Sequence, residues 1–489
     1  RVREGSLLVR GGRLADPRES ARVVTGRVVG AAIADVRIAG GRIEAVAPAL
    51  EPGTDEAVLD AGERVVLPGV HDHHLHLRSL AARGRSVGVG PADASGAEAM
   101  ARLLRDAPAD RSGWRRAVGY HESVAGDLDR RALDAMVPGA PVRVQHRSGV
   151  MWVLNSAAVD ALGVEEAREP GIERDAAGRA TGRLFRMDAW LARRLPGEAS
   201  TTDVAEVSRR LAGLGVTGIT DATPGATPEA VAELGEALRE GRLLQRAHLM
   251  CPAGLSVPRH PLLTRGPEKL MLDDDRLPAL DALAESIARA HGAGLPVAVH
   301  CVTAVQLVLT VAALEVAGTR AGDRIEHGAV VPRDVLPRLA ALRATLVVNP
   351  GLLFDRGDTY LDEVDERDLP DLLRGASLHA AGIPVAAGTD APFGSPDPWL
   401  AVAAAHRRRT SAGRALGPEE ALDEATALAL FSGDPRDPAR PRRVEVGAPG
   451  DLCILDGDAL PAPAGSGGPV PATVVAGRVV HCTIPEWDG

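Results

Sequence analysis

The stretch LPGVHDHHLHL, residues 67–77, places four histidines and an aspartate within six positions behind a short apolar lead-in. Side chains two apart on a strand point to the same side, so either His71 and His73 or His74 and His76 can hold one metal ion between them. The spacing alone does not choose between the two pairs. Position favours the later pair, because barrel enzymes carry their chemistry at the carboxyl ends of their strands. The alternative is a histidine-rich surface strand that binds no metal.

The chain beyond this stretch alternates amphipathic helical segments with short apolar segments that end in polar residues. This rhythm indicates βα units and a parallel sheet. Eight segments suit the strand role: residues 71–77, 216–223, 244–251, 268–275, 296–303, 323–328, 344–350 and 383–392. Eight is the count of a closed barrel. The sequence therefore predicts an α/β fold, a (β/α)8 TIM barrel with its active site at the carboxyl ends of the strands.

The two ends of the chain differ from this middle part. Residues 1–66 and 440–489 contain short strand-like segments with Gly-Gly and Ala-Gly turns, and we expect them to pair into one small β-sandwich domain. The barrel domain then spans residues 67–439. Its segment from about 78 to 200 is too long for one crossover, so we expect an inserted α/β subdomain after the first barrel strand, above the barrel mouth.

The composition excludes several classes of protein. Basic residues number 56 against 66 acidic ones, a net charge of −10, and no basic block of the kind that binds nucleic acid is present. No apolar run reaches the roughly 18 residues of a membrane span, and the first residues lack the apolar core of a signal peptide. Four cysteines without CxxC spacing suit a reducing cytoplasm. We expect a cytoplasmic protein that binds a small molecule, with neither nucleic acid nor membrane as partner; homo-oligomerisation is compatible with the sequence.

Lys269 is the only lysine in the chain, so 55 of the 56 basic residues are arginine. Arginine stays protonated, whereas a lysine near metal ions can lose its proton and act as a nucleophile or be carboxylated to a carbamate. Chance survival of one lysine in an arginine-rich composition is the alternative. The retained amine favours a chemical role for this position.

Closing the predicted barrel would bring six potential metal ligands together at the carboxyl ends of five strands. They are His74, His76, Lys269, His300, His327 and Asp390. Each is a weak signal alone, since a single histidine is more often packed or capping and an aspartate between glycine and proline is often a turn residue. Together, these nitrogen and oxygen ligands suit a divalent metal, with zinc as the leading expectation.

The motifs in this order resemble the amidohydrolase superfamily. They are PG-x-x-D-x-H-x-H over residues 68–76, the strand-four lysine, VAVHC, RIEHG, GTDAP and the closing APGDLCIL. The segments PVRVQHRSG, WVLNSAAVDALG, EKLMLDD and AAGTDAPFGSPDPW are similar to the branch that includes N-substituted formamide deformylases and related metal-dependent amide hydrolases. The resemblance covers nearly the whole chain. It implies the barrel with a β-sandwich built from both chain ends, and it points to His74 and His76 as the liganding pair.

The resemblance also implies a role for each residue of the ring. One metal would be held by His74, His76 and Asp390, a second by His300 and His327, and a carboxylated Lys269 would bridge them. The implied reaction is hydrolysis of a C–N amide bond, in an N-acyl, N-formyl or cyclic amide, by a metal-activated hydroxide. Asp390 would carry the proton to the leaving nitrogen. We expect zinc as the cofactor, two ions per chain or one.

The chain departs from this branch at two places in the inserted segment. It has Gly149-Val150 where the branch commonly has Gly-His, and Gly182-Arg-Leu-Phe-Arg186 where the branch has Gly-x-Leu-x-Glu. These departures predict a substrate other than the branch's commonest one. Five residues of the insertion are candidates for the substrate pocket: His121, Glu122, His146, Arg147 and Arg186. Solvent exposure or salt bridging is the alternative for each, and an inward arginine would favour a substrate with a carboxylate.

Two other functions remain open at this point. A mononuclear deaminase of a heterocycle would use one metal and release ammonia, and Lys269 argues against it. A non-catalytic barrel that binds a ligand would accommodate the two departures, but six costly polar groups kept together argue against it.

Overall fold

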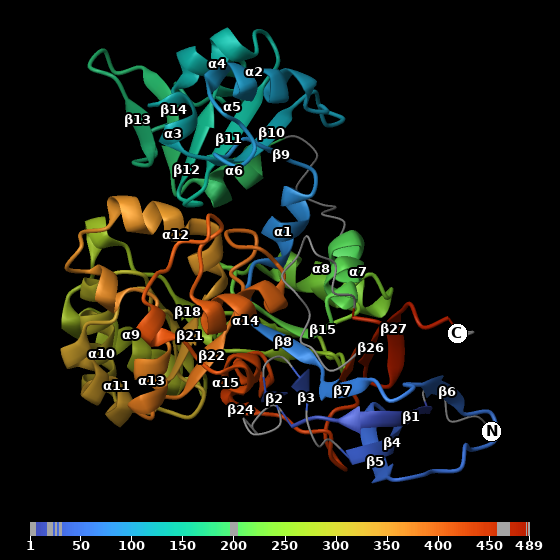
Figure 1. Ribbon diagram of the computed structural model, residues 1–489. Helices are drawn as coiled ribbons and strands as arrows, with labels where there is room; N and C mark the ends of the chain where they lie inside the picture. Colours follow the sequence, from blue (N-terminus) through green and yellow to red (C-terminus); the bar gives the residue numbers. More distant parts are fainter. Residues whose placement is uncertain are drawn as a thin grey trace. The chain divides into compact units, whose positions relative to one another are not determined.

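The computed structural model describes residues 6–16, 23–24, 27–28, 32–195, 204–456, 470–485 and 487. The chain divides into two compact units, Arg78–Asp203 and a larger unit made of Arg1–Leu77 and Val204–Gly489. Figure 1 labels the helices and strands of both units. None of the helices within the described ranges is long and apolar enough to cross a lipid bilayer.

Strands from both ends of the chain pair in one eight-stranded sheet of the larger unit. Its order is β27-β26-β25-β7-β1-β4-β5, with β6 beside β1. The strands are β1 (Leu7–Leu14), β4 (Ala32–Ala39), β5 (Arg42–Ala47), β6 (Ala57–Asp60), β7 (Val65–Pro68), β25 (Leu452–Leu455), β26 (Ala472–Val475) and β27 (Arg478–Cys482). Separately, β2 (Val23–Val24) pairs with β3 (Arg27–Val28) in antiparallel orientation. Strand β7 links the two ends, since Val66 lies opposite Ile454.

The local chemistry of this sheet explains its turns and its core. Between β4 and β5, Gly40 and Gly41 both have positive φ, 57° and 75°. A two-residue hairpin turn of this kind requires positive φ at both central residues, which glycine adopts without strain. Apolar side chains from seven of the strands, among them Val36, Ile454 and Val474, are buried in one cluster. The core of this sheet therefore draws on residues more than 400 positions apart.

Nine parallel strands form two further sheets in the same unit, with orders β17-β16-β15-β8 and β18-β19-β20-β21-β22. They are β8 (Val70–Leu75), β15 (Val216–Asp221), β16 (Arg246–Leu249), β17 (Leu263–Arg265), β18 (Glu268–Leu270), β19 (Val297–Cys301), β20 (Arg324–His327), β21 (Thr345–Val348) and β22 (Val385–Ala387). Each of the eight segments expected from the sequence overlaps one of these strands, and the predicted α/β class is confirmed. Strand β17 was not predicted, because three residues are too few to display a periodic pattern.

Helices connect the parallel strands or follow the last of them. They are α7 (Val204–Gly213), α8 (Pro228–Arg239), α9 (Leu280–Gly292), α10 (Ala304–Ala317), α11 (Leu336–Leu342), α12 (Gly351–Glu363), α13 (Ala376–Ala380), α14 (Pro398–Arg407) and α15 (Glu424–Ala429). Several begin at side-chain caps: Thr227 accepts a hydrogen bond from Ala230 N at α8, and Thr303 accepts one from Gln306 N at α10. These caps satisfy backbone donors that the first helical turn leaves open.

Backbone hydrogen bonds continue past the outer strands of both parallel sheets. On one side, Asp390 N donates to the His74 oxygen at 2.7 Å, and His76 N donates to the Ala391 oxygen at 2.8 Å. On the other side, Cys251 N donates to the Pro267 oxygen at 3.2 Å. The end of β22 is thus tied to β8, and the segment after β16 is tied to the residue that precedes β18.

The smaller unit is built around a six-stranded mixed sheet of order β13-β14-β12-β11-β10-β9. Its strands are β9 (Val87–Gly88), β10 (Arg115–Tyr120), β11 (Val142–His146), β12 (Met151–Leu154), β13 (Ile172–Arg174) and β14 (Ala180–Phe185). Its helices are α1 (Leu77–Arg83), α2 (Ala97–Asp106), α3 (Glu122–Ala125), α4 (Arg130–Met136), α5 (Ser156–Leu162) and α6 (Asp188–Arg194). One core cluster contains Met100 and Leu133 of α2 and α4, and a second contains Trp152, Leu162 and Trp190. This unit therefore has apolar cores of its own.

Candidate active site

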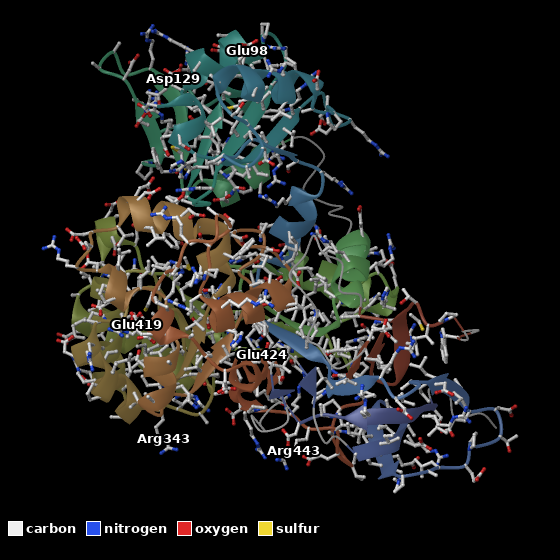
Figure 2. All side chains as sticks on the ribbon, viewed as in Figure 1. Glu98, Asp129, Arg343, Glu419, Glu424 and Arg443 are labelled. Atoms are coloured by element: carbon white, nitrogen blue, oxygen red, sulfur yellow. The ribbon has the colours of Figure 1, made fainter. Side chains whose placement is uncertain are left out.

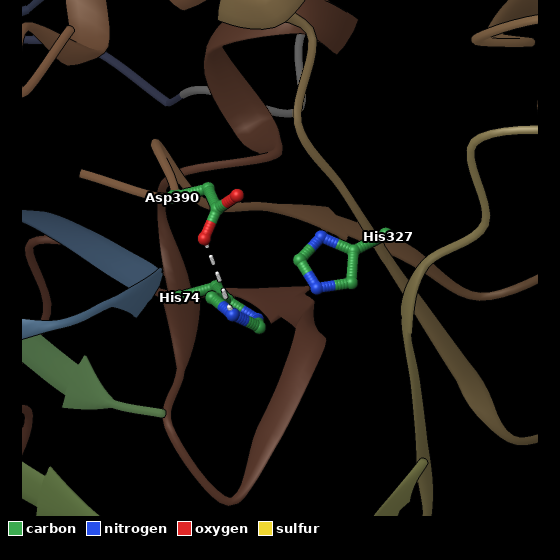
Figure 3. Close-up of side chains that lie close together, drawn as sticks. All are labelled: His74, His327 and Asp390. Atoms are coloured by element: carbon green, nitrogen blue, oxygen red, sulfur yellow. Dashed lines mark ion pairs between the residues drawn. The ribbon is translucent and has the colours of Figure 1, made fainter. Parts of the chain in front are cut away.

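Polar side chains gather where the parallel strands of the larger unit end. Oδ1 of Asp390 lies 3.2 Å from Nε2 of His76 and 3.6 Å from Nε2 of His74. The ring of His327 lies with its centroid 4.6 Å from that of His74 and 4.6 Å from that of His300. Figure 3 shows Asp390, His74 and His327 facing one another from three different segments. Five of the six residues predicted as ligands therefore form one contiguous cluster.

The chemistry of this cluster fits a metal ion. Ligand atoms of His74, His327 and Asp390 all lie within 4.8 Å of one another, and all three residues are buried. Nε2 of His74, Oδ1 of Asp390 and Nζ of Lys269 are buried without a hydrogen-bond partner among the described residues. Leaving such atoms without partners costs free energy, and a bound cation would satisfy the lone pairs of the imidazole and the carboxylate.

Three imidazoles of the cluster, those of His74, His300 and His327, are held in the neutral form that binds metals. Burial lowers the pKa of His74 and of His327, and it lowers the pKa of His300 to about 2. Burial alone would raise the pKa of Asp390, but the neighbouring His76, His327 and His74 lower it well below its ordinary range. At neutral pH His74, His300 and His327 are thus uncharged and Asp390 is ionised, the forms in which these side chains bind metals.

Lys269, on β18, is the sixth predicted ligand. Burial lowers its pKa to about 8, although Glu326 and Asp390 raise it. Its charge in turn contributes to the lowered pKa of His74, His300 and His327, so the amine lies within electrostatic reach of the cluster. A pKa near 8 leaves a substantial fraction of the amine neutral at physiological pH. The neutral amine is the reactive form of lysine.

Glu326 orients His74, and the sequence did not single it out. Its side chain is fully buried and contacts Nδ1 of His74, the ring nitrogen opposite Nε2. Arg324 fixes the carboxylate in turn, with Nε donating to Oε1 of Glu326 at 2.7 Å. A carboxylate on Nδ1 selects the tautomer whose Nε2 lone pair is free for a metal. Its place in RIEHG, directly before His327, was the available signal.

Two further residues position the cluster and were also missed. Oδ1 of Asn349, just after β21, lies 2.8 Å from Nδ1 of His327. Asp72 of β8 accepts hydrogen bonds from Thr389 N at 3.0 Å and from Thr389 Oγ1 at 2.5 Å. Asp72 therefore ties the strand that carries His74 to the turn that carries Asp390. Asp72 and Asn349 lie within segments that the sequence predicts as strands. Their partners, Thr389 and His327, belong to other strand segments, so local spacing did not reveal the contacts.

The backbone at the cluster is strained. His327 and Asp390 have φ values of 71° and 56°. This left-handed region is unfavourable for residues with a side chain, by about 1 kcal/mol or more for each residue. Strain of this kind concentrates at functional sites, where the surrounding structure holds it in place.

The other histidine pair of the opening stretch lies in a different environment. Nε2 of His71 is 2.9 Å from Oγ1 of Thr220, and the centroid of its ring is 4.6 Å from that of His73. Both rings are buried, and burial lowers the pKa of each well below its ordinary value. These two histidines belong to the packed interior of the parallel sheets.

Three of the five candidates from the inserted segment form a cluster within the smaller unit. Oε2 of Glu122 lies 3.2 Å from Nε2 of His146 and 3.6 Å from Nε2 of His121. Nδ1 of His121 accepts the backbone N–H of Ser123, and Nδ1 of His146 accepts that of Ser148. Each Nε2 must then carry the proton of the neutral ring and point it at Glu122. The three side chains contact one another within the smaller unit, and their role in a substrate pocket stays a prediction.

The two arginine candidates lie elsewhere in the smaller unit. Arg147 N donates to the Tyr120 oxygen at 2.8 Å, and the charge of Arg147 contributes to a lowered pKa of His146, for which burial is the main cause. Arg186 follows β14 with a positive φ of 55°, and its N–H donates to the Val150 oxygen at 2.8 Å. Arg147 is thus close to the histidine cluster, and Arg186 is joined to the other departure position, Val150.

Comparison with known proteins shows similarity along most of the chain. The model of a family described as "Amidohydrolase family" matches residues 57–481. The N-substituted formamide deformylase of Arthrobacter pascens is 27% identical over 499 residues, which cover 86% of this chain and 90% of that enzyme.

Solved structures show the likeness in fold. An uncharacterized metal-dependent hydrolase from Pyrococcus furiosus has a TM-score of 0.71 at 20% identity, covering 93% of this chain and 100% of that one. Atrazine chlorohydrolase TrzN from Arthrobacter aurescens TC1, complexed with zinc, has a TM-score of 0.54 at 14% identity, covering 98% and 96%.

Proposed function

The chain belongs to the amidohydrolase family and is a hydrolase of carbon–nitrogen bonds other than peptide bonds, and from this premise we propose that it cleaves an amide of a small molecule. The proposed substrates are N-formyl, N-acyl and cyclic amides. The observation that carries the proposal is the buried group of His74, His327 and Asp390, whose ligand atoms all lie within 4.8 Å of one another. The formamide deformylase relative supports an amide as the substrate class.

We also propose that the two parallel sheets close into a single (β/α)8 barrel. The hydrogen bonds between Asp390 and His74 and between Cys251 and Pro267 support closure at the two seams. In this proposal the barrel spans residues 67–439, with an inserted subdomain at about 78–200, and residues 1–66 with 440–489 make a β-sandwich. Barrel closure explains why side chains from β8, β20 and the end of β22 meet.

The proposed cofactor is a pair of divalent metal ions, with zinc as first choice. His74, His76 and Asp390 would hold one ion, and His300 and His327 the other. Lys269, carboxylated by carbon dioxide, would supply one oxygen to each. The chemistry supplied by ions bound there is the activation of water near neutral pH and the polarisation of a carbonyl. Removing the ammonium charge from Lys269 also removes its repulsion of the cations.

The residues of the chain divide the remaining work between them. Asp390 is ionised at neutral pH, so Oδ1 can accept the proton of the attacking water and return it to the leaving nitrogen. Glu326 and Asn349 hold the rings of His74 and His327 in fixed orientations through their Nδ1 atoms. A site positioned in advance in this way need not reorganise as charge develops on the substrate.

One observation favours a second candidate function, a mononuclear deaminase of a heterocycle. His74, His327 and Asp390 alone form a three-ligand group, which is enough for one catalytic ion with an open position. Such an enzyme would release ammonia from a ring substrate.

Metal analysis combined with a substrate screen separates the two candidates. Protein purified without chelators is assayed for metal by mass spectrometry and then offered N-formyl, N-acyl and cyclic amides alongside amino-substituted heterocycles. The proposed function requires close to two metals per chain and the release of an amine or opening of a ring amide. If the protein binds one metal per chain and releases ammonia from heterocycles, the deaminase is the correct function and the proposed amide hydrolysis is wrong.

A further inference from the structure

The smaller unit contains a large pocket that the proposed chemistry does not use. Its volume is about 840 Å³, and it is lined by α1, by the loop before β10, by β10 to β12 and by α6. All the lining residues belong to the smaller unit, and none is a predicted metal ligand. Pockets of roughly 300–1,000 Å³ hold small organic molecules, so the size is that of a ligand site.

The pocket is positively charged in an acidic protein. Five arginines line it: Arg78, Arg85, Arg111, Arg116 and Arg143. The two lining carboxylates are engaged locally, since Oδ1 of Asp110 accepts Ser112 N at 2.7 Å and Oδ1 of Asp188 accepts Nε1 of Trp152 at 2.8 Å. A concave wall with an excess of one sign of charge focuses the field and attracts the opposite charge. The net charge of the whole chain, −10, makes this local excess of arginine distinctive.

The geometry of the pocket wall points to the same kind of ligand. Arg116 of β10 and Arg143 of β11 are direct partners across the parallel strands. Their guanidinium carbons lie 5.4 Å and 5.5 Å from the centroid of the Trp152 ring. Both guanidinium groups thus lie beside one aromatic side chain of the wall, so cations and an indole ring are presented together.

Part of the wall is apolar and held in place by packing. Trp114 and Trp152 are each 4% exposed, and Leu191 of α6 is buried in the same core cluster. Side chains fixed by packing lose little freedom when a ligand binds. The wall therefore combines anchored cations with aromatic and aliphatic surface.

We propose that this pocket is a second ligand site, which binds an organic anion with an aromatic or apolar body, in the class of aryl carboxylates. Guanidinium groups match the planar fork of a carboxylate, and the tryptophan and leucine side chains match the body that carries it. The site goes beyond the proposed amide hydrolysis, because it needs neither the metal ligands nor a metal.

Isothermal titration calorimetry of the full-length, metal-loaded protein with 2-naphthoate tests the proposal. We expect one site per chain in the smaller unit. The uncharged analogue 2-naphthylmethanol should bind at least roughly tenfold more weakly, since charge-assisted hydrogen bonds contribute about 1.5–3 kcal/mol. Arg85→Gln and Arg111→Gln, at exposed positions, should each weaken binding by about threefold to tenfold, and Arg143→Gln should weaken it further. If Arg143→Gln fails to fold, the two exposed variants and the neutral analogue still decide the outcome.

Two controls separate this site from the metal cluster. Arg102→Gln changes an arginine of α2 that is 58% exposed, paired with Glu98 and absent from the pocket wall; Figure 2 labels Glu98. It should leave naphthoate affinity unchanged, and so should Lys269→Arg. Equal affinity for naphthoate and naphthylmethanol overturns the proposal. So does binding that survives the arginine substitutions but is lost with Lys269→Arg, a result that would leave the proposed hydrolase intact.

Discussion

Lys269 shows how burial changes the chemistry of a single side chain. The chain uses arginine at every other basic position, and arginine cannot give up its proton near neutral pH. Burial lowers the pKa of Lys269 to about 8, so the amine can react with carbon dioxide or approach a cation without carrying a full charge. The residue therefore combines rarity in the sequence with the one property that arginine lacks.

Replacing Lys269 by arginine keeps a basic side chain but removes the titratable amine. We expect turnover of the best amide substrate to fall by at least about a thousandfold, because a guanidinium adds a permanent positive charge beside the metal site. Metal content per chain should fall in parallel. Circular dichroism and thermal unfolding control for folding. A variant with normal turnover and metal content would remove Lys269 from the mechanism.

Glu326 is the residue whose replacement best tests positioning. The Glu326→Gln substitution keeps the shape but weakens the hold on Nδ1 of His74, so metal affinity should fall by about 10–100-fold. Competition with a chelator of known affinity measures this fall. Thermal unfolding measures any loss of stability caused by weakening the contact between Arg324 and residue 326. Glu315→Gln is the matched control, since Glu315 is 41% exposed and pairs with Arg338 on the surface. Equal metal affinity for the two variants would mean that Glu326 has only a structural role.

At the scale of strands, the interior of the parallel sheets contains buried histidines that make the folded state less stable in acid. Burial lowers the pKa of His248, on β16, to about 3, and its Nδ1 lies 2.8 Å from Oγ1 of Thr264. The unfolded chain binds a proton here near pH 6.5, whereas the folded chain does not until about pH 3. The contribution of His248 to stability is therefore complete above pH 6.5 and is lost as the pH falls toward 3.

Replacing His248 by asparagine should make the protein less sensitive to acid. Between pH 7.5 and 5, His248 accounts for a loss of about 2 kcal/mol, since 1.5 pKa units at about 1.4 kcal/mol each separate pH 5 from 6.5. Denaturant unfolding of metal-free protein at both pH values measures the difference. The exposed His379, replaced by asparagine, is the control. An unchanged pH dependence in the His248→Asn protein contradicts the prediction.

The strands themselves were predictable, and the contacts between them were not. Residues 296–303 are apolar and end in polar residues, which is sufficient to recognise β19. Residues 323–328 have one aliphatic side chain, Ile325, and only the repeated order of helix and strand indicated β20. The convergence of their histidines followed from the common edge of a parallel sheet. The pairings of Glu326 with His74 and of Asn349 with His327 depend on distances across the fold, and no local spacing encodes them. The same is true of the wall formed by Arg116, Arg143 and Trp152.

At the scale of the molecule, the two units have separate cores, which predicts separate folding. Met100 and Trp152 represent the two apolar clusters of the smaller unit, whereas Val36 and Ile454 belong to a cluster of the larger one. We expect a fragment of residues 78–203 to unfold cooperatively on heating, as measured by circular dichroism. The full chain should show two calorimetric transitions. A single transition, with a fragment that has no cooperative unfolding, would contradict this prediction.

The strand order of the terminal sheet has a consequence for biosynthesis. Strand β7 runs directly into β8 and its histidines, yet its partner β25 lies about 390 residues later, with Val66 opposite Ile454. At roughly 5–20 residues per second, a ribosome needs about 20–80 seconds to cover that distance. Until then the N-terminal strands expose an unpaired edge, to which chaperones or neighbouring nascent chains can bind. The pairing of β7 with β25 can therefore form only after translation has passed Leu452.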